Sequence, residues 1–313
     1  MKTTAQVVFV GTAALDSIAL VEELPGEDAR VEALDLAIVG GGNASTAAVA
    51  CARLGVDVEF AGVVGDDEYG TRVIALLDSE GVGTRHVIVD PDATTPCSLV
   101  LVSRASGKRA IVTRPATRSP GVPTGFDWVH VDKSGYPGLR ANAARSSKIS
   151  VDDGNEIPGI ELAAMTLYVP TLTVLRGRFP GLSIPGALTA AREAGASTVV
   201  ATAGSQGAYG ADASGLYFVP GVRVPVVSTL GAGDVFHGAL LAATVLGLAL
   251  PEAIRLANVT AAMSCRALDG RSGIPTLSEV EAALSFAPPA DRISARSQGA
   301  PLSKTPINQM EEL

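Results

Sequence analysis

The segment from Val226 to Leu250 constrains the fold of this chain more than any other stretch. An extended apolar pair, Val226 and Val227, leads into Gly231-Ala232-Gly233, and an uncharged run follows Asp234. A strand-like stretch, a glycine turn and a helix form the repeating unit of α/β folds. The glycines let the main chain approach a bulky anion, and the free N–H groups of the following helix point at the same place. The segment therefore predicts an α/β fold with a phosphate-binding turn.

Asp234 stands at the start of the expected helix. A carboxylate in this position could accept a proton from a hydroxyl group while nearby amides hold the charge of a transferring phosphoryl group. This interpretation predicts phosphorylation of an alcohol. The alternative is structural, because glycine turns often precede helices and Asp is a favoured N-cap residue.

Two motifs carry a resemblance to a known family. The sequence Thr229-Leu230-Gly231-Ala232-Gly233-Asp234 resembles the C-terminal signature of the ribokinase-like (PfkB) carbohydrate kinases, in which the last Asp is the general base. Gly41-Gly42-Asn43-Ala44-Ser45 resembles their N-terminal glycine signature in its ketohexokinase-like form. The similarity covers residues 6–286. Residues 231–239 and 270–275 look most like the sulfofructose kinase and ketohexokinase branch.

The resemblance implies a ribokinase-like α/β fold, with a three-layer α/β/α core, a mostly parallel sheet and a small β-sheet lid. Composition agrees, since 47% of the residues are hydrophobic but only 4% aromatic, which favours Ala, Val and Leu helices on a Val-rich sheet. We expect one kinase domain over residues 1–287, with lid segments at about 17–39 and 98–114. Residues 288–313 are rich in Pro, Ser, Gln and charge and are expected to form a disordered tail.

The chain alternates strand-like and helix-like stretches, which predicts a parallel sheet with right-handed crossovers. The expected strands are 6–11, 17–24, 31–39, 58–64, 87–89, 98–103, 109–114, 128–131, 148–152, 197–202 and 223–227. The expected helices are 44–54, 68–80, 184–194, 234–250, 251–268 and 277–284.

Charge and cysteine content exclude several classes of protein. The net charge is −8 and the pI about 5.0, with scattered Lys and Arg, so neither nucleic acid nor an anionic membrane surface is an expected partner. Cys51, Cys97 and Cys265 lack metal-ligand spacing and are expected to be reduced core residues of a cytoplasmic protein. The uncharged run 235–250 is too short for a membrane span, and no signal peptide is visible.

The resemblance assigns roles to individual residues. It makes Asp234 the base and the amides of Gly231, Ala232 and Gly233 the anion-binding groups. The implied sugar-binding residues are Asp16, Asp28, Gly41, Gly42, Asn43, Arg109 and Lys133. Each has a structural alternative: the two aspartates could be turn residues, Asn43 an N-cap, and the two cations solvated surface charges.

The implied nucleotide-binding residues are Thr202, Gly204, Gly207, Thr229, Gly231 and Asn258. Other nucleotide folds do not fit. No Gly-x-x-x-x-Gly-Lys-Ser/Thr sequence is present, and Phe236 stands where a dinucleotide-binding Gly-x-Gly-x-x-Gly motif needs its third glycine. His86, His130 and His237 show no zinc spacing, and we expect His237 to be a core residue or a group behind the site.

The chain departs from the family pattern at two places. Ser228 replaces an Asp that helps to bind a monovalent cation in ribokinases, which weakens the expectation of potassium activation. The Asn-x-x-Glu motif that organises magnesium should fall near residues 168–176, but no acidic residue occurs between Glu161 and Glu193. Asp152 and Asp153, with Asn155 nearby, are therefore the predicted magnesium-binding residues, acting through water.

These features together predict an ATP- and magnesium-dependent sugar kinase that phosphorylates a primary hydroxyl of a furanose or ketose. A fructose-like sugar is favoured. Ribose, a nucleoside, or an acidic sugar held by Arg109, Arg114 or Lys133 remains open. A protein that binds sugar or nucleotide without turnover is the rival class, because of the missing motif and Ser228. The exposed lid edges suggest a homodimer.

Overall fold

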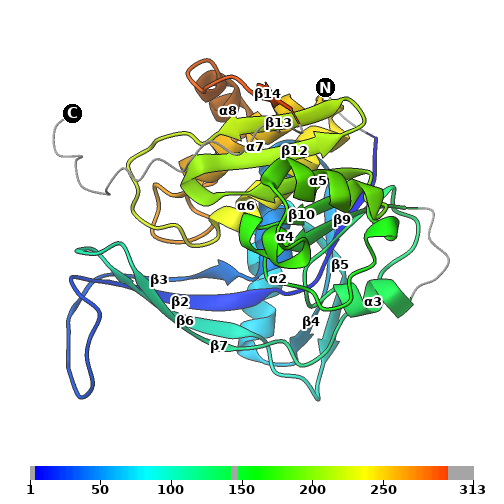
Figure 1. Ribbon diagram of the computed structural model, residues 1–313. Helices are drawn as coiled ribbons and strands as arrows, with labels where there is room; N and C mark the ends of the chain where they lie inside the picture. Colours follow the sequence, from blue (N-terminus) through cyan, green and yellow to red (C-terminus); the bar gives the residue numbers. More distant parts are fainter. Residues whose placement is uncertain (1–3, 142–146, 295–313) are drawn as a thin grey trace.

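The computed structural model describes residues 4–141 and 147–294, and its centre is a ten-stranded sheet (Figure 1). The strand order is β14-β13-β12-β11-β10-β9-β8-β1-β4-β5. Neighbours from β11 to β5 are parallel, and those from β11 to β14 are antiparallel. The bounds are β1 Val7–Val10, β4 Val58–Gly65, β5 Gly83–Asp90, β8 Trp128–Val131, β9 Lys148–Asp153, β10 Leu167–Pro170, β11 Thr198–Thr202, β12 Gly207–Asp212, β13 Gly215–Pro220 and β14 Asp291–Ile293.

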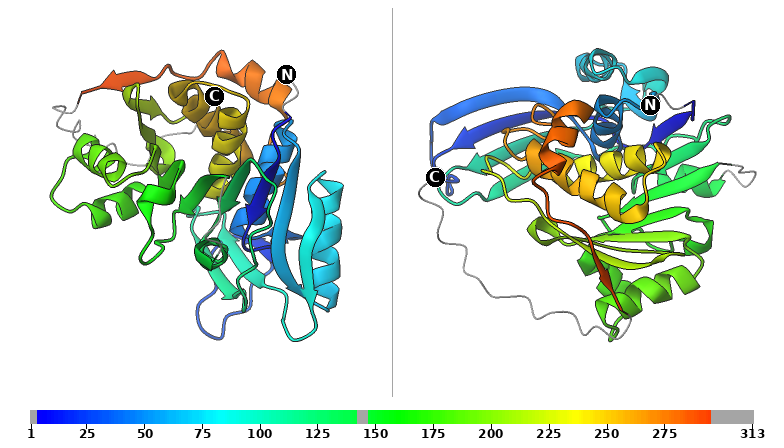
Figure 2. Two further views of the ribbon diagram at one scale, coloured as in Figure 1. Left: turned by 90° about the vertical axis from the view of Figure 1, so that its right-hand side faces the viewer. Right: turned by 90° about the horizontal axis from the view of Figure 1, so that it is seen from above.

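Helices cover both faces of this sheet (Figure 2). Strand β1 shows why: its four apolar residues are all buried, and alternate side chains enter two separate cores. Helices α1, α2, α6, α7 and α8 contribute to one core and α3, α4 and α5 to the other. The predicted three-layer fold is confirmed. The bounds are α1 Asn43–Arg53, α2 Glu68–Ser79, α3 Tyr136–Ala141, α4 Leu172–Arg178, α5 Ile184–Glu193, α6 Ala232–Val245, α7 Leu250–Ser264 and α8 Leu277–Leu284.

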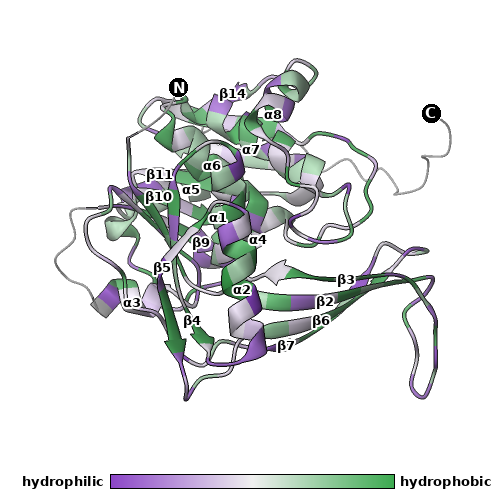
Figure 3. Ribbon diagram, turned by 180° about the vertical axis from the view of Figure 1, so that it is seen from behind, coloured by the Kyte–Doolittle hydropathy of each residue, from purple (hydrophilic) through white to green (hydrophobic). Residues whose placement is uncertain are grey.

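A separate sheet of order β3-β2-β6-β7 forms the predicted lid (Figure 3). Its strands are β2 Ala14–Val21, β3 Ala33–Gly41, β6 Cys97–Ser103 and β7 Arg109–Arg114. The buried Ile18, Val100 and Val102 join it to Leu230 and Leu268 of the core. The first lid hairpin is shifted relative to the expected strands 17–24 and 31–39. Strand β2 begins earlier, at Ala14, and β3 continues into the glycine run, to Gly41.

Two predicted elements are wrong. Residues 223–227 form no strand, because Pro225 lacks the N–H that a ladder needs, and the antiparallel hairpin β12–β13 supplies that edge of the sheet instead. The expected disordered tail contains strand β14, which pairs with β13, so the folded region passes residue 287. The rest of that predicted tail, residues 295–313, lies outside the described residues.

The remaining sequence-based expectations concern the long apolar segments and the thiols. No helix within residues 4–141 and 147–294 has the length and apolar character that crossing a membrane requires. Cys51 and Cys265 are buried core residues as expected, whereas Cys97 is only partly buried at the start of β6.

Candidate active site

The start of α6 forms a turn that is open toward solvent. Gly231 has a φ of +73°, and a Cβ atom there would lie 2.8 Å from Gly270 Cα, so only glycine fits. Gly233 differs, because a Cβ at that position would meet no atom within 4 Å. The first turn of α6 thus leaves open space beside Gly233, and Asp234 is the next residue. Such a turn suits an anionic group.

The N-terminal glycine motif meets this turn. Gly42 has a φ of +94°, and α1 begins at the next residue, Asn43. The Asn43 side-chain amide Nδ2 donates a 2.7 Å hydrogen bond to Asp234 Oδ1. Helices α1 and α6 can approach closely because Gly238 has no side chain: a Cβ there would lie 2.0 Å from the Ala47 carbonyl oxygen. The two sequence motifs therefore form a single site.

Asp132 organises the loops around this meeting point, and the sequence analysis did not identify it. Its buried carboxylate follows β8 and accepts hydrogen bonds from the backbone N–H groups of Thr12 (2.8 Å), Ala44 (3.3 Å), Ser134 (2.9 Å) and Gly135 (2.9 Å). It thereby ties α1 to the loops that follow β1 and β8. Its place just after a buried parallel strand, where ligand sites form in α/β sheets, was the available signal.

The environment of Asp234 is suited to a base. Loss of solvation raises the pKa of this carboxyl group to about 7, and the neighbouring carboxylates Asp152 and Asp132 act in the same direction. The Asn43 hydrogen bond and the charge of His237 oppose that rise. A general base works best when its pKa lies near the operating pH.

A buried pair lies behind Asp234. His237 Nε2 is 3.1 Å from Asp152 Oδ1, which also accepts a 2.7 Å hydrogen bond from the Gly154 N–H. Burial alone would lower the pKa of His237, but the Asp152 carboxylate raises it above its usual value. Burial and the nearby His237 lower the pKa of His130 to about 3, so that neighbouring imidazole is neutral.

The predicted magnesium pair, Asp152 and Asp153, is wrong as a pair. Asp153 is fully buried and accepts hydrogen bonds from Tyr168 Oη (2.8 Å), the Ile157 N–H (2.6 Å) and Arg178 Nε (2.9 Å). Asp152 instead contacts His237. The part of the chain that the structure describes contains no group of three or more His, Cys, Asp or Glu residues that could hold a metal ion.

The two departures from the family pattern have structural roles. Near the expected Asn-x-x-Glu position, Thr171 caps α4 by accepting a hydrogen bond from the Val174 N–H at 3.3 Å. Ser228 is buried and its hydroxyl accepts a hydrogen bond from the Leu230 N–H at 3.2 Å, within the turn before α6. Neither position carries the carboxylate that the family pattern would place there.

The predicted sugar-binding residues divide into two groups. Asp16, on β2, lies against Gly41: a Cβ atom on Gly41 would be 1.9 Å from Asp16 Oδ2. The other carboxylate oxygen of Asp16, Oδ1, is buried without a hydrogen bond. Asp16, Gly41, Gly42 and Asn43 therefore line one end of the site. Asp28 is not brought to it: this exposed residue lies in the connection between β2 and β3, which Figure 1 shows at the tip of the lid.

A buried arginine that the sequence analysis missed supports Asp16 and the glycine run. Arg271 donates hydrogen bonds to the Gly41 carbonyl oxygen (3.0 Å), Ser45 Oγ (2.8 Å) and Thr46 Oγ1 (3.2 Å). Burial lowers the pKa of its guanidinium to about 10, and the charge of Asp16 opposes this. The group stays cationic at neutral pH, beneath the junction of lid and core.

Arg109 and Lys133 belong to different elements, β7 and the loop after β8. Arg109 Nη1, at the start of β7, donates a 2.6 Å hydrogen bond to Thr229 Oγ1 and so links the lid to the anion-binding turn. The exposed Lys133 borders a cavity of about 20 Å³. Its other lining residues are Asn43, Asp132, Ser134, Asp152 and Asn155. A cavity of this size holds about one water molecule.

The predicted nucleotide-binding residues follow β11 and α6. Thr202 ends β11 and forms a bridge with Thr171, and Gly204 opens a short turn with a φ of +59°. Gly207 has a packing role, since a Cβ there would lie 2.0 Å from the Val219 carbonyl oxygen. The Asn258 amide donates to the carbonyl oxygens of Val219 (3.1 Å) and Pro220 (3.2 Å), which makes it a clamp on β13.

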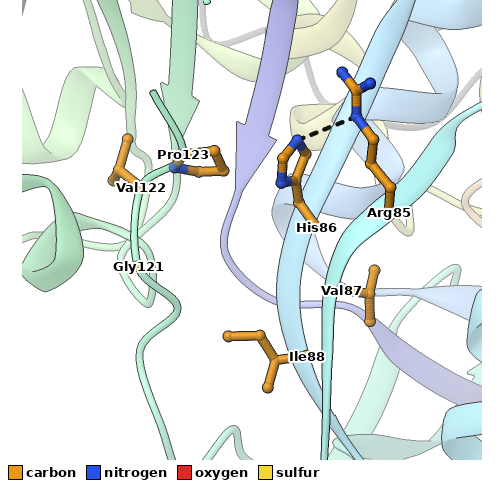
Figure 4. Close-up of a pocket in the computed structure, with 7 residues that line it drawn as sticks. All are labelled: Arg85, His86, Val87, Ile88, Gly121, Val122 and Pro123. Carbon is orange, nitrogen blue, oxygen red and sulfur yellow. Dashed lines mark hydrogen bonds between the residues drawn. The ribbon is translucent and has the colours of Figure 1, made fainter. Parts of the chain in front are cut away.

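A second hollow, of about 390 Å³, contains none of the predicted site residues (Figure 4). It lies between the edge strand β5 and residues 121–123, and it is lined by Arg85, His86, Val87, Ile88, Gly121, Val122 and Pro123. Its size alone does not make it the reaction site, because the motif residues converge at the start of α6.

Comparisons with known proteins find relatives that match most of this chain. Ketohexokinase of Mus musculus is 28% identical over 86% of this chain and 98% of its own length. Ribokinase of Lactococcus lactis is 25% identical over 89% of this chain and 97% of its own length. Among solved structures, Arabidopsis thaliana ribokinase superposes with a TM-score of 0.76 at 23% identity, covering 92% of this chain and all of its own.

A family model described as "pfkB family carbohydrate kinase" matches residues 4–135 and 177–277. These segments contain both glycine motifs, Asp16, Asn43 and Asp234. The chain therefore belongs to the pfkB family of carbohydrate kinases and is a sugar kinase.

Proposed function

We propose that this protein transfers the γ-phosphoryl group of ATP to a primary hydroxyl of a furanose or ketose, either fructose-like or ribose-like. The observation that carries the proposal is the 2.7 Å hydrogen bond between Asn43 and Asp234, because it places a base and a hydroxyl-binding amide in one site beside the amides of α6. The ketohexokinase and ribokinase relatives support both sugar classes.

The residues divide the chemistry among them. Asp234 accepts the hydroxyl proton as the oxygen attacks the γ-phosphorus. The amides of Gly231, Ala232 and Gly233 stabilise the charge on the transferring group. The sugar is oriented by Asp16, Gly41, Gly42 and Asn43. Anionic groups at the far end of the substrate would contact Arg109 and Lys133. Closure of the lid excludes water that would otherwise accept the phosphoryl group.

ATP would bind from the turn before α6 toward the end of β11, where Thr229, Thr202 and Gly204 lie. Magnesium would enter with the phosphates, since this ion keeps several waters and takes few protein ligands. The described residues do not form a carboxylate cage for it.

The lid is proposed to form a homodimer. On its outer face, strand register places Ile38, Ser17, Leu99 and Val112 in one row and Leu36, Ala19, Leu101 and Ala110 in the next. Leu36 is 71% exposed and Val112 68%. These two rows contain no charged side chain and suit a second copy of the same sheet. In such a dimer the lid tip of one copy would bring its Asp28 toward the sugar site of the other copy, whereas Asp28 does not reach the sugar site of its own copy.

The experiment that tests the function is Asp234→Asn assayed by ADP release over a panel of fructose, ribose, a nucleoside and an acidic sugar. We expect turnover to fall about 10²- to 10⁴-fold, with ATP affinity by calorimetry little changed, because a base acts only on the chemical step. Asp57→Asn, an exposed aspartate away from the site, is the matched control.

Two results would contradict the proposal. Full turnover in Asp234→Asn would show that Asp234 is not the general base. A wild-type protein that is stabilised thermally by a sugar but releases no ADP with any of them would be a binding protein without turnover.

A further inference from the structure

Three carboxylates lie near the start of α6. Asp234 stands in the first turn, Asp152 ends β9 and Asp132 follows β8, and both neighbours make ionisation of Asp234 harder. Like charges at short range in a poorly solvated site repel one another strongly. A site of this kind needs a cation close to the carboxylates.

Four basic side chains near these carboxylates have contacts or protonation states that do not pair them with Asp152. Arg178 binds Asp153, on the other side of β9. Arg271 is bound to the glycine run and α1, although its charge also faces Asp16 and Asp234. Lys133 is exposed at the border of the small cavity. His130 is neutral and bonds Ser150.

His237 is the basic side chain that touches Asp152. It lies on the same helix as Asp234, three residues later, which is one turn along one face. It is 5% exposed, and its Nε2 reaches Asp152 Oδ1 at 3.1 Å. Its Nδ1 is buried with no hydrogen-bond partner among the described residues, so Asp152 is the polar group that fixes the ring.

We propose that His237 is a positioning residue for phosphoryl transfer. As the buried counter-ion of Asp152, it fixes that carboxylate and neutralises its charge. Asp234 then faces a neutral pair instead of a second bare negative charge. The inference rests on the proposed role of Asp234 as the base. His237 touches neither substrate nor reacting atoms in this scheme, and it acts through Asp152.

The first test reads the pair directly and requires no turnover. The imidazole resonances of the full chain are followed by NMR against pH, with His237 assigned through the His237→Asn variant. We expect His237 to stay protonated above its ordinary pKa of about 6.5, and Asp152→Asn to lower its titration midpoint by about one pH unit or more. A His237 midpoint at or below 6.5 that Asp152→Asn leaves unmoved would overturn the inference.

The second test is the pH dependence of kcat/KM for the best sugar. Asp234 works only when ionised, so the rate falls on the acid side of its pKa of about 7. His237→Asn keeps a hydrogen-bond donor but removes the cation, and it should move this acid limb up by about one pH unit. Asp152→Asn removes the repelling charge and should move it down.

The double variant separates charge from packing. With both members of the pair neutral, the acid limb should return close to its wild-type position, because the two effects on Asp234 cancel. His86→Asn, at the outer hollow of Figure 4, is the control for replacing a histidine and should leave the profile unchanged.

The contrary outcomes are distinct. If His237→Asn and Asp152→Asn lower kcat/KM equally at every pH without moving the limb, the pair is only a packing element and the inference fails. Failure of the proposed function would look different, since Asp234→Asn would then keep its turnover.

Discussion

The raised pKa of Asp234 determines how this residue affects the stability of the fold. Its pKa is raised from 3.8 to about 7 in the fold by loss of solvation and by its carboxylate neighbours. The folded state therefore holds a proton that the unfolded chain has released between these two values. The contribution of Asp234 to stability is complete below pH 3.8 and is lost as the pH rises through 7.

We predict that Asp234→Asn is more thermally stable than the wild type at pH 8 in the absence of ligands. The substituted amide keeps an oxygen for the Asn43 hydrogen bond but carries no charge. The difference in Tm should shrink steadily as the pH is lowered from 8 toward 4, where the wild-type carboxyl group is protonated. Calorimetric melting curves over this pH range measure it, and a difference independent of pH would contradict the assignment.

At the residue scale, the sequence predicted the groups that belong to continuous motifs and missed those whose partners are distant. Asn43 and Asp234 could be named because their neighbours identify them. Asp132 and Arg271 could not, because their roles depend on contacts with segments far away in the chain. Asp153 was assigned wrongly because adjacent residues of a strand point to opposite faces, which sends Asp152 to α6 and Asp153 to α4.

Substitutions in the first turn of α6 should affect stability and activity differently. Gly233 lies within the helix, and a Cβ at this position would meet no protein atom within 4 Å. We expect Gly233→Ala to fold normally and to gain up to about 1 kcal/mol of stability from better helix propensity. The new methyl group would enter the space proposed for the transferring phosphoryl group, so turnover should fall at least about 10²-fold.

Gly231→Ala is the contrasting variant of the same turn. Its positive φ and its contact with Gly270 Cα leave no room for a side chain, so it should lower both Tm and activity. Thermal melting and ADP release measured on both variants test the prediction. A Gly233→Ala protein with full turnover would show that the phosphoryl group does not bind against these amides.

The lid strand β7 contacts the anion-binding turn through Arg109. Its hydrogen bond to Thr229 joins the lid to the turn before α6. We predict that Arg109→Ala raises KM for ATP about tenfold with a smaller change in kcat, because a charge-assisted contact is lost outside the chemical step. Arg104→Ala, on the same lid but paired with Glu22, is the control. Equal effects of the two changes would indicate general loosening of the lid.

Elements with strong local signals were predicted well. Helix α8 was expected at residues 277–284 and is found there, and β7 was expected at 109–114 and is found there. The strand expected at 223–227 is absent because Pro225 cannot donate to a ladder, although its neighbours are apolar. Strand β10 and helix α4 were missed, since four buried residues and a seven-residue helix carry little periodicity.

For the whole molecule, we predict a dimer held by the outer face of the lid. Leu36→Lys combined with Val112→Lys places charges in both apolar rows and should convert the dimer to a monomer in sedimentation experiments. Leu182→Lys, an exposed leucine before α5 that is 48% exposed, is the matched control and should leave the mass unchanged. A wild-type protein that sediments at 31.7 kDa would contradict the dimer.

The overall topology could be predicted because alternating strands and helices permit few arrangements. The antiparallel edge formed by β12, β13 and β14 could not, because β14 pairs with a strand from which it is distant in the chain, and its sequence resembles the tail around it.

The contact at Gly238 has a consequence for the order of events. At this glycine the α6 backbone packs directly against the α1 backbone, and Asp132 accepts a hydrogen bond from the Ala44 N–H in the first turn of α1, so we expect the two helices to move as one unit. We therefore expect opening of the lid to leave the contact between Asp234 and Asn43 intact. The proposed base and its amide partner would then be in place before a substrate binds, and the lid would be the part that moves.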